Sequence, residues 1–164
     1  MMPNKRPSKG RTIWVFVGLL GLNLLISGLG GAITAGSVND WYAQLVKPSF
    51  NPPNWIFGPV WSLLYLLMAI AAWRVWREAG FRAAHNALLL YGVQLAVNLL
   101  WSALFFGLQR PGIALVACVA LLISISATAW AFRRHDLVAA ILFLPYIAWV
   151  SFACLLNGAI VALN

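Results

Sequence analysis

Five apolar stretches dominate the chain and constrain its fold more than any other feature. Each is long enough to cross a bilayer as a helix of about 20 residues, and they span residues 13–35, 56–76, 85–108, 112–132 and 137–163. With 63% hydrophobic residues and only three acidic side chains among 164, the composition lies outside that of ordinary soluble domains. We therefore predict an all-α membrane protein, with a basic tail at residues 1–12 and a single bundle of five transmembrane helices over residues 13–164.

The basic residues gather in short segments between the apolar stretches and form no continuous basic face, so nucleic acid is not an expected partner despite the net charge of +8. Nine of the eleven lie in the N-terminal tail and after the second and fourth stretches: Lys5, Arg6, Lys9, Arg11, Arg74, Arg77, Arg82, Arg133 and Arg134. By the positive-inside rule these segments face the cytoplasm. For a bacterial cell membrane, we expect a cytoplasmic N-terminus and an external C-terminus.

Patterns typical of conventional catalysis and metal binding are missing from the sequence. No carboxylate lies deep in an apolar stretch, so neither a proton relay nor paired acid–base catalysis is expected. Cys118 and Cys154 lack the paired spacing of metal or redox motifs, and we interpret them as small buried hydrophobes. We predict no metal site. Asp136 is positioned to cap the last helix at its N-terminus.

The segment 40–55, DWYAQLVKPSFNPPNW, differs from the other connections because it is stiff and aromatic. Its prolines, Pro48, Pro52 and Pro53, restrict the backbone. Aromatic side chains add bulk at the water boundary: Trp41, Tyr42, Phe50, Trp55 and the following Phe57. Two interpretations remain open, an interfacial aromatic belt and a rigid lid over a cavity between the helices.

Helical spacing places aromatic and amide side chains on one face of three predicted helices. At steps of three and four residues these faces carry Trp61, Tyr65, Met68 and Ala72, then Tyr91, Gln94, Asn98, Trp101 and Phe105, then Tyr146, Trp149, Ala153 and Asn157. Amides in hydrocarbon need partners, so these faces are expected to point into the bundle. They either join the helices or line a pocket for a flat apolar ligand.

Small residues in the first stretch form two pairs spaced by four, Ser27 with Gly31 and Gly28 with Ala32. This spacing favours close helix packing and also leaves room for a ligand. Pro145, inside the fifth stretch, frees a backbone carbonyl and is expected to kink its helix.

Three long motifs in a fixed order carry a family resemblance: WYAQLVKPSFNPPNWIFGPVWSLLYLLM, YGVQLAVNLLWSALFFG and LPYIAWVSFACLLN. Over about residues 18–157 the chain resembles the TspO/MBR family of tryptophan-rich sensory proteins and translocator proteins, also called peripheral benzodiazepine receptors. The resemblance implies a five-helix bundle in the lipid bilayer, often a homodimer, whose first loop folds over a pocket. That pocket binds porphyrins and haem-related tetrapyrroles as ligands, with no required cofactor, and also isoquinoline carboxamides and benzodiazepines.

The resemblance also implies roles for individual residues. Trp61 and Trp149 match family tryptophans implicated in light-dependent porphyrin breakdown, and the pocket positions match Ala32, Tyr42, Asn98, Trp101 and Ala153. From the loop and the aromatic faces, the remaining candidate ligand-binding residues are Trp41, Lys47, Tyr65, Gln94 and Tyr146. Lys47 is placed to meet a propionate at the outer rim.

Two positions depart from the family pattern. Phe50 stands where the family usually has Trp in the lid motif, which removes an N–H donor and keeps the ring. Mammalian members carry a sterol-recognition pattern at the end of the fifth helix, in which a basic residue follows a Tyr. This chain has no basic residue after Tyr146, so sterol binding is not expected.

Three functions remain open, ranked in this order. The first is a tetrapyrrole-binding sensor or regulator of a tetrapyrrole or stress response. The second is a transporter of porphyrins or other amphipathic ligands, although the sequence lacks the internal repeats and intramembrane charges typical of active transporters. The third is an enzyme that breaks down porphyrin with light and oxygen, in which Trp61 and Trp149 are catalytic.

Overall fold

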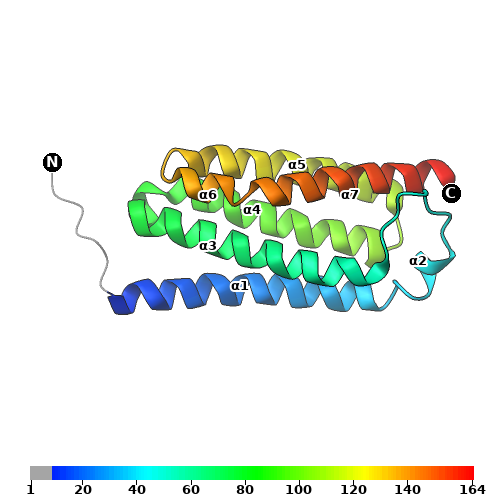
Figure 1. Ribbon diagram of the computed structural model, residues 1–164, viewed down its shortest axis with the longest axis horizontal. Helices are drawn as coiled ribbons and strands as arrows, with labels where there is room; N and C mark the ends of the chain where they lie inside the picture. The colour runs from blue at the N-terminus through cyan, green and yellow to red at the C-terminus, as the bar shows by residue number, and fades with distance from the viewer. Residues whose placement is uncertain (1–8) are drawn as a thin grey trace.

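The computed structural model describes residues 9–164, so Lys5 and Arg6 of the predicted basic tail lie outside the described residues. Within this range five helical segments are long and apolar enough to cross a membrane. The helices lie side by side along the long dimension of the molecule (Figure 1). They are α1 (Lys9–Ala35), α3 (Phe57–Ala83), α4 (His85–Ser102), α5 (Pro111–Arg133) and α7 (Leu144–Leu163). No strand occurs among the described residues, and the predicted all-α membrane fold is confirmed.

Four short elements complete the fold. The connection between α1 and α3 contains α2 (Trp41–Gln44) and a 3₁₀ turn at Asn54–Ile56. A π-helical turn, Ala103–Gly107, extends α4, and α6 (Leu137–Ile141) precedes α7.

The predicted fifth stretch is divided into α6 and α7. Asp136 accepts a hydrogen bond from the Ala139 N–H at 2.9 Å, which confirms the predicted N-cap. Pro145 lies in the first turn of α7, where a missing N–H leaves no helical bond unmade. The kink expected at Pro145 is therefore a break between the two helices.

The two ends of the bundle carry different connections between the helices. The start of α1, the α3–α4 junction and the α5–α6 turn lie at one end, while α2, its flanking loop and the C-terminus lie at the other (Figure 1). The basic segments at residues 11, 74–82 and 133–134 thus share one end of the molecule, as the alternation of five spans requires.

The core lies mainly between α3, α4, α5 and α7, whose facing side chains form one apolar cluster. Met68 and Tyr146 are fully buried there, and Gln94 and Asn98 are buried as well. The predicted aromatic and amide faces of α3, α4 and α7 therefore point into the bundle. α1 packs against α3 and α4 and leaves most of its apolar side chains exposed, as expected for a helix in contact with lipid.

Candidate ligand-binding cavity

A cavity of about 390 Å³ lies among α1, α3, α4 and α7, at the end of the bundle that carries the α1–α3 loop. α1 contributes a wall of small residues, including Ser27, Gly30 and Gly31, so one of the two predicted small-residue pairs faces the cavity. The opposite walls are mostly aromatic and aliphatic, with a few polar groups. This combination of size and lining is typical of small-molecule pockets.

Trp61 of α3 is the centre of the aromatic wall. Its ring centroid lies 5.8 Å from that of Tyr65, 6.0 Å from that of Tyr146 and 6.3 Å from that of Trp101. Trp101 in turn stacks on Phe105 at 5.8 Å. Rings packed at these separations support one another and present flat apolar surfaces to the cavity.

Asn98 joins three helices beside this wall. Its Oδ1 accepts a hydrogen bond from the Tyr65 hydroxyl at 2.7 Å, and its Nδ2 donates to the Tyr146 hydroxyl oxygen at 2.8 Å. Trp101 Nε1 similarly donates to Asn157 Oδ1 at 3.3 Å. Since these polar groups already have partners, a ligand would be held mainly by contact with the rings. The amide of Asn98 both joins helices and lines the cavity.

The α1–α3 loop borders the cavity on the side of α2 through Tyr42, which is buried. Burial raises the pKa of Tyr42 to about 12, so its hydroxyl stays neutral and donates to Asn51 Oδ1 at 2.7 Å. The Lys47 ammonium donates to the carbonyls of Ala43 and Leu45, both at 3.1 Å, and lies 5.0 Å from the Tyr42 ring centroid. Lys47 is therefore engaged within the loop and is not part of the cavity lining.

The structure brings half of the candidate residues together on the cavity wall: Tyr42, Trp61, Tyr65, Asn98, Trp101 and Ala153. Tyr146 lies behind Trp61, and Trp41 packs edge to face on Phe105 at 5.6 Å. Gln94 is one turn deeper and donates to Met68 Sδ at 3.6 Å.

Two further candidates also lie off the wall. Ala32 is exposed on the outer surface of α1. Trp149 contacts the cavity-lining Phe57 with ring centroids 5.8 Å apart, so it adjoins the cavity without lining it.

A buried polar residue on α1 was missed by sequence reasoning. Asn23 is fully buried and donates to the Leu19 carbonyl at 2.8 Å and to the Tyr91 hydroxyl. The signal was present in the sequence, because Asn23, Ser27 and Thr34 recur at helical spacing and mark the inward face of α1.

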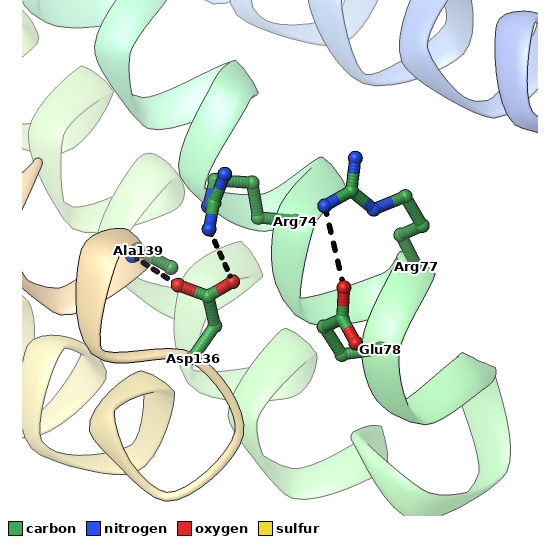
Figure 2. A network of polar contacts seen from close by, with 5 residues as sticks. All are labelled: Arg74, Arg77, Glu78, Asp136 and Ala139. Carbon is green, nitrogen blue, oxygen red and sulfur yellow. Dashed lines mark hydrogen bonds and ion pairs between the residues drawn. The ribbon is translucent and has the colours of Figure 1, made fainter.

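An ion pair at the other end of the bundle was also missed. Arg74 Nη2 lies 2.8 Å from Asp136 Oδ2, while Arg77 pairs with its neighbour Glu78 at 3.3 Å (Figure 2). Burial alone raises the pKa of Asp136, but hydrogen bonds from the Ala139 N–H and Arg74, together with the Arg74 charge, outweigh it. The net result is a pKa below the ordinary value for an aspartate.

Among residues 9–164, no three or more His, Cys, Asp or Glu side chains lie close enough together to hold a metal ion. Besides aliphatic groups, the side chains that line the cavity carry aromatic rings, amides and hydroxyls.

Comparisons with known proteins agree on one family. The sequence model of the TspO/MBR family matches residues 13–163. The tryptophan-rich protein TspO of Archaeoglobus fulgidus is 45% identical, over 86% of this chain and 91% of its own. The tryptophan-rich sensory protein of Cereibacter sphaeroides is 39% identical over 85% and 88%, and the translocator protein of Bos taurus 41% over 79% and 78%.

Proposed function

Because the chain belongs to the TspO/MBR family, we propose that it binds a porphyrin or haem-related tetrapyrrole in this cavity and acts as a sensor or regulator. The supporting observation is the wall formed by Trp61, Trp101 and Phe105, whose rings suit a flat macrocycle. The sensing role takes support from a relative named as a tryptophan-rich sensory protein.

The α1–α3 loop acts in this proposal as a lid. Val38, Tyr42 and Asn54 of the loop line the cavity. The Val46 N–H donates to Asn164 Oδ1, and Asn164 Nδ2 donates to the Val46 carbonyl, both at 3.0 Å. This double hydrogen bond fastens the loop to the end of α7. Loop prolines reduce the conformational entropy that closure would otherwise cost.

Ligand occupancy is read out, in this proposal, through the position of the lid. A bound macrocycle in contact with Tyr42 and Trp61 stabilises the closed loop, so a partner protein on the same side of the membrane meets a different surface in the free and bound states. The homodimer implied by the family resemblance stays a prediction, to be tested by chemical cross-linking in proteoliposomes.

The test is a titration of the purified protein with protoporphyrin IX in the dark, followed by tryptophan fluorescence. We expect saturable quenching that weakens in Trp61→Phe, since this substitution changes the cavity wall. Trp130→Phe is the matched control, because Trp130 is an exposed residue of α5 away from the cavity. Unsaturable quenching that is equal in all three proteins would refute the proposal.

A second candidate function is light-dependent porphyrin breakdown with oxygen as the oxidant. It is favoured by the contact of Trp61 with Tyr65 and Trp101, because these oxidisable rings would lie next to a macrocycle bound in the cavity. We expect Trp61→Phe to slow the loss of porphyrin absorbance under illumination more than Trp149→Phe, since Trp149 reaches the cavity only through Phe57. Breakdown by the wild type no faster than by a variant that carries both Trp61→Phe and Trp149→Phe would exclude this activity.

A further inference from the structure

The two cysteines of the chain meet between α5 and α7. Cys118 Sγ and Cys154 Sγ are 2.7 Å apart, although 36 positions separate them in the sequence. Cys118 is only 1% exposed, whereas Cys154 is half-buried. Both are free thiols, and the chain has no other cysteine. Sequence spacing gives no hint of this pair, because only the packing of α5 against α7 creates it.

We propose that Cys118 and Cys154 form a redox-modification site, at which a membrane-soluble hydroperoxide converts the two thiols into a disulfide that links α5 to α7. The S–S bond of a disulfide is about 2.05 Å long, so the two sulfurs would have to approach each other by less than one ångström. This site is separate from the cavity lining and does not depend on tetrapyrrole binding.

The chemistry balances in two steps. The Cys154 sulfur attacks the hydroperoxide, the O–O bond breaks, and the products are a sulfenic acid and an alcohol. The Cys118 sulfur then attacks the sulfenic sulfur, the S–S bond forms, and water leaves with the hydroxyl group and the thiol proton. Two electrons pass from the thiol pair to the peroxide, and no other oxidant is required.

The position of the pair determines which oxidant can reach it. Both sulfurs lie inside membrane-spanning helices, and Leu155, next to Cys154, is 68% exposed on the lipid-facing surface. Hydroperoxides of unsaturated acyl chains arise in the same phase, whereas charged aqueous oxidants are excluded from it. Cys154 is the first thiol to react because it is the more exposed of the two. Cys118 then reacts at the high effective concentration that contact provides.

The proposed disulfide between Cys118 and Cys154 would lie next to the cavity wall. Ala153, Leu156 and Asn157, which flank Cys154 on α7, line the cavity, while Cys118 lies in the middle of α5. A disulfide would therefore fix this wall to α5 and restrict its movement. Oxidation of the thiol pair in the membrane would thus make the bundle more rigid between α5 and α7.

The experiment counts free thiols in the reconstituted protein. Proteoliposomes are treated with cumene hydroperoxide, unfolded in detergent, and alkylated with a maleimide polyethylene glycol that shifts the gel mobility once per thiol. We expect two labels before treatment, none afterwards on a monomeric band, and two again after dithiothreitol. Two labels after treatment, a disulfide between chains, or a loss that dithiothreitol does not reverse would each overturn the proposal.

A matched control moves one thiol while keeping two. Val116 is 70% exposed on α5 and lies two residues from Cys118, on the opposite side of the helix. Arsenite, which reduces sulfenic acids and leaves disulfides intact, is added after the treatment and before alkylation. The wild type should then still show no label, whereas the variant Cys118→Ser with Val116→Cys should show two labels on its monomeric band. Should that variant fail to fold, Cys154→Ser with Leu155→Cys makes the same test from α7. Loss of both labels within monomers of either folded control would show that contact is not the cause, and would overturn the proposal.

Discussion

At the scale of the residue, the cavity wall contains two kinds of side chain. Asn98 hydrogen-bonds to both Tyr65 and Tyr146 and also lines the cavity, so its replacement changes packing and binding together. Ala153 lines the cavity and carries no polar group. The two positions therefore call for different measurements, stability at Asn98 and affinity at Ala153.

Replacement of Asn98 by Ala leaves the hydroxyls of Tyr65 and Tyr146 without their present partner. Each buried group left unsatisfied costs about 1–3 kcal/mol, so the apparent Tm in detergent should fall by several degrees even without ligand. Ser62→Ala is the control, because Ser62 also lines the cavity but, within residues 9–164, its hydroxyl bonds only to the Gly58 carbonyl of its own helix, at 2.9 Å. An equal Tm in both variants would show that Asn98 does not join the helices.

Replacement of Ala153 by Leu should weaken porphyrin binding by about tenfold, because the larger side chain enters the cavity and overpacking of this kind costs about 1–3 kcal/mol. Ala32→Leu makes the same chemical change on the exposed surface of α1 and should leave affinity unchanged. Fluorescence titration in the dark measures both variants. Equal losses of affinity at the two positions would mean that the ligand lies elsewhere, against α1.

At the scale of the element, polar side chains fix the two ends of the α6–α7 segment. Asp136 caps α6 and pairs with Arg74 of α3, so it holds the α6–α7 segment against the bundle. Asn164 fastens the loop to the other end of α7. These contacts act on whole segments, and their loss should be measurable without any change in the cavity wall.

The Arg74–Asp136 pair predicts a pH dependence of stability. Because the pKa of Asp136 is lowered by folding, its stabilising contribution is complete above about pH 4, near the ordinary aspartate value, and is lost as the pH falls through the lowered pKa. Asp136→Asn keeps the helix cap and removes the charge, so its apparent Tm should be lower at pH 7 and fall less than that of the wild type on acidification. Asp136→Ala should lose about 1 kcal/mol more, since it also removes the cap. Identical acid dependence in the wild type and Asp136→Asn would contradict this account.

Loosening the loop at Asn164 should speed ligand release. Asn164→Ala removes the two hydrogen bonds to Val46, so residues 45–53 should be cleaved faster by added protease and bound porphyrin should dissociate several times faster. Ser126→Ala is the control, because Ser126 is exposed on α5 and, in the described part of the chain, its hydroxyl bonds only to its own helix, through the Leu122 carbonyl at 2.7 Å. Unchanged dissociation in Asn164→Ala would show that the loop is held closed by other contacts.

At the scale of the whole molecule, the bundle and the buried faces could be predicted from the sequence because both depend on local periodicity. Apolar length sets the spans, and a period of 3.6 residues brings Tyr65, Asn98 and Tyr146 inward. The Cys118–Cys154 contact and the Arg74–Asp136 pair could not be predicted, because they depend on how separate helices pack. Ala32 was expected on the cavity wall but is exposed, whereas its neighbour Gly31 lines the cavity. Successive residues of a helix point in directions about 100° apart, so an error of one position moves a side chain off the wall.

The number of spans and the position of the basic residues predict how the molecule is oriented in the membrane. Five spans put the two ends of the chain on opposite sides, and the basic end of the bundle should face the cytoplasm by the positive-inside rule. In a bacterial host, alkaline phosphatase fused after Asn164 should therefore be active, and green fluorescent protein at the same position should be dark. The same two reporters fused to the N-terminus should give the reverse result. Active phosphatase at both ends would rule out an odd number of spans, and a fluorescent C-terminal fusion would mean that another feature outweighs the basic clusters.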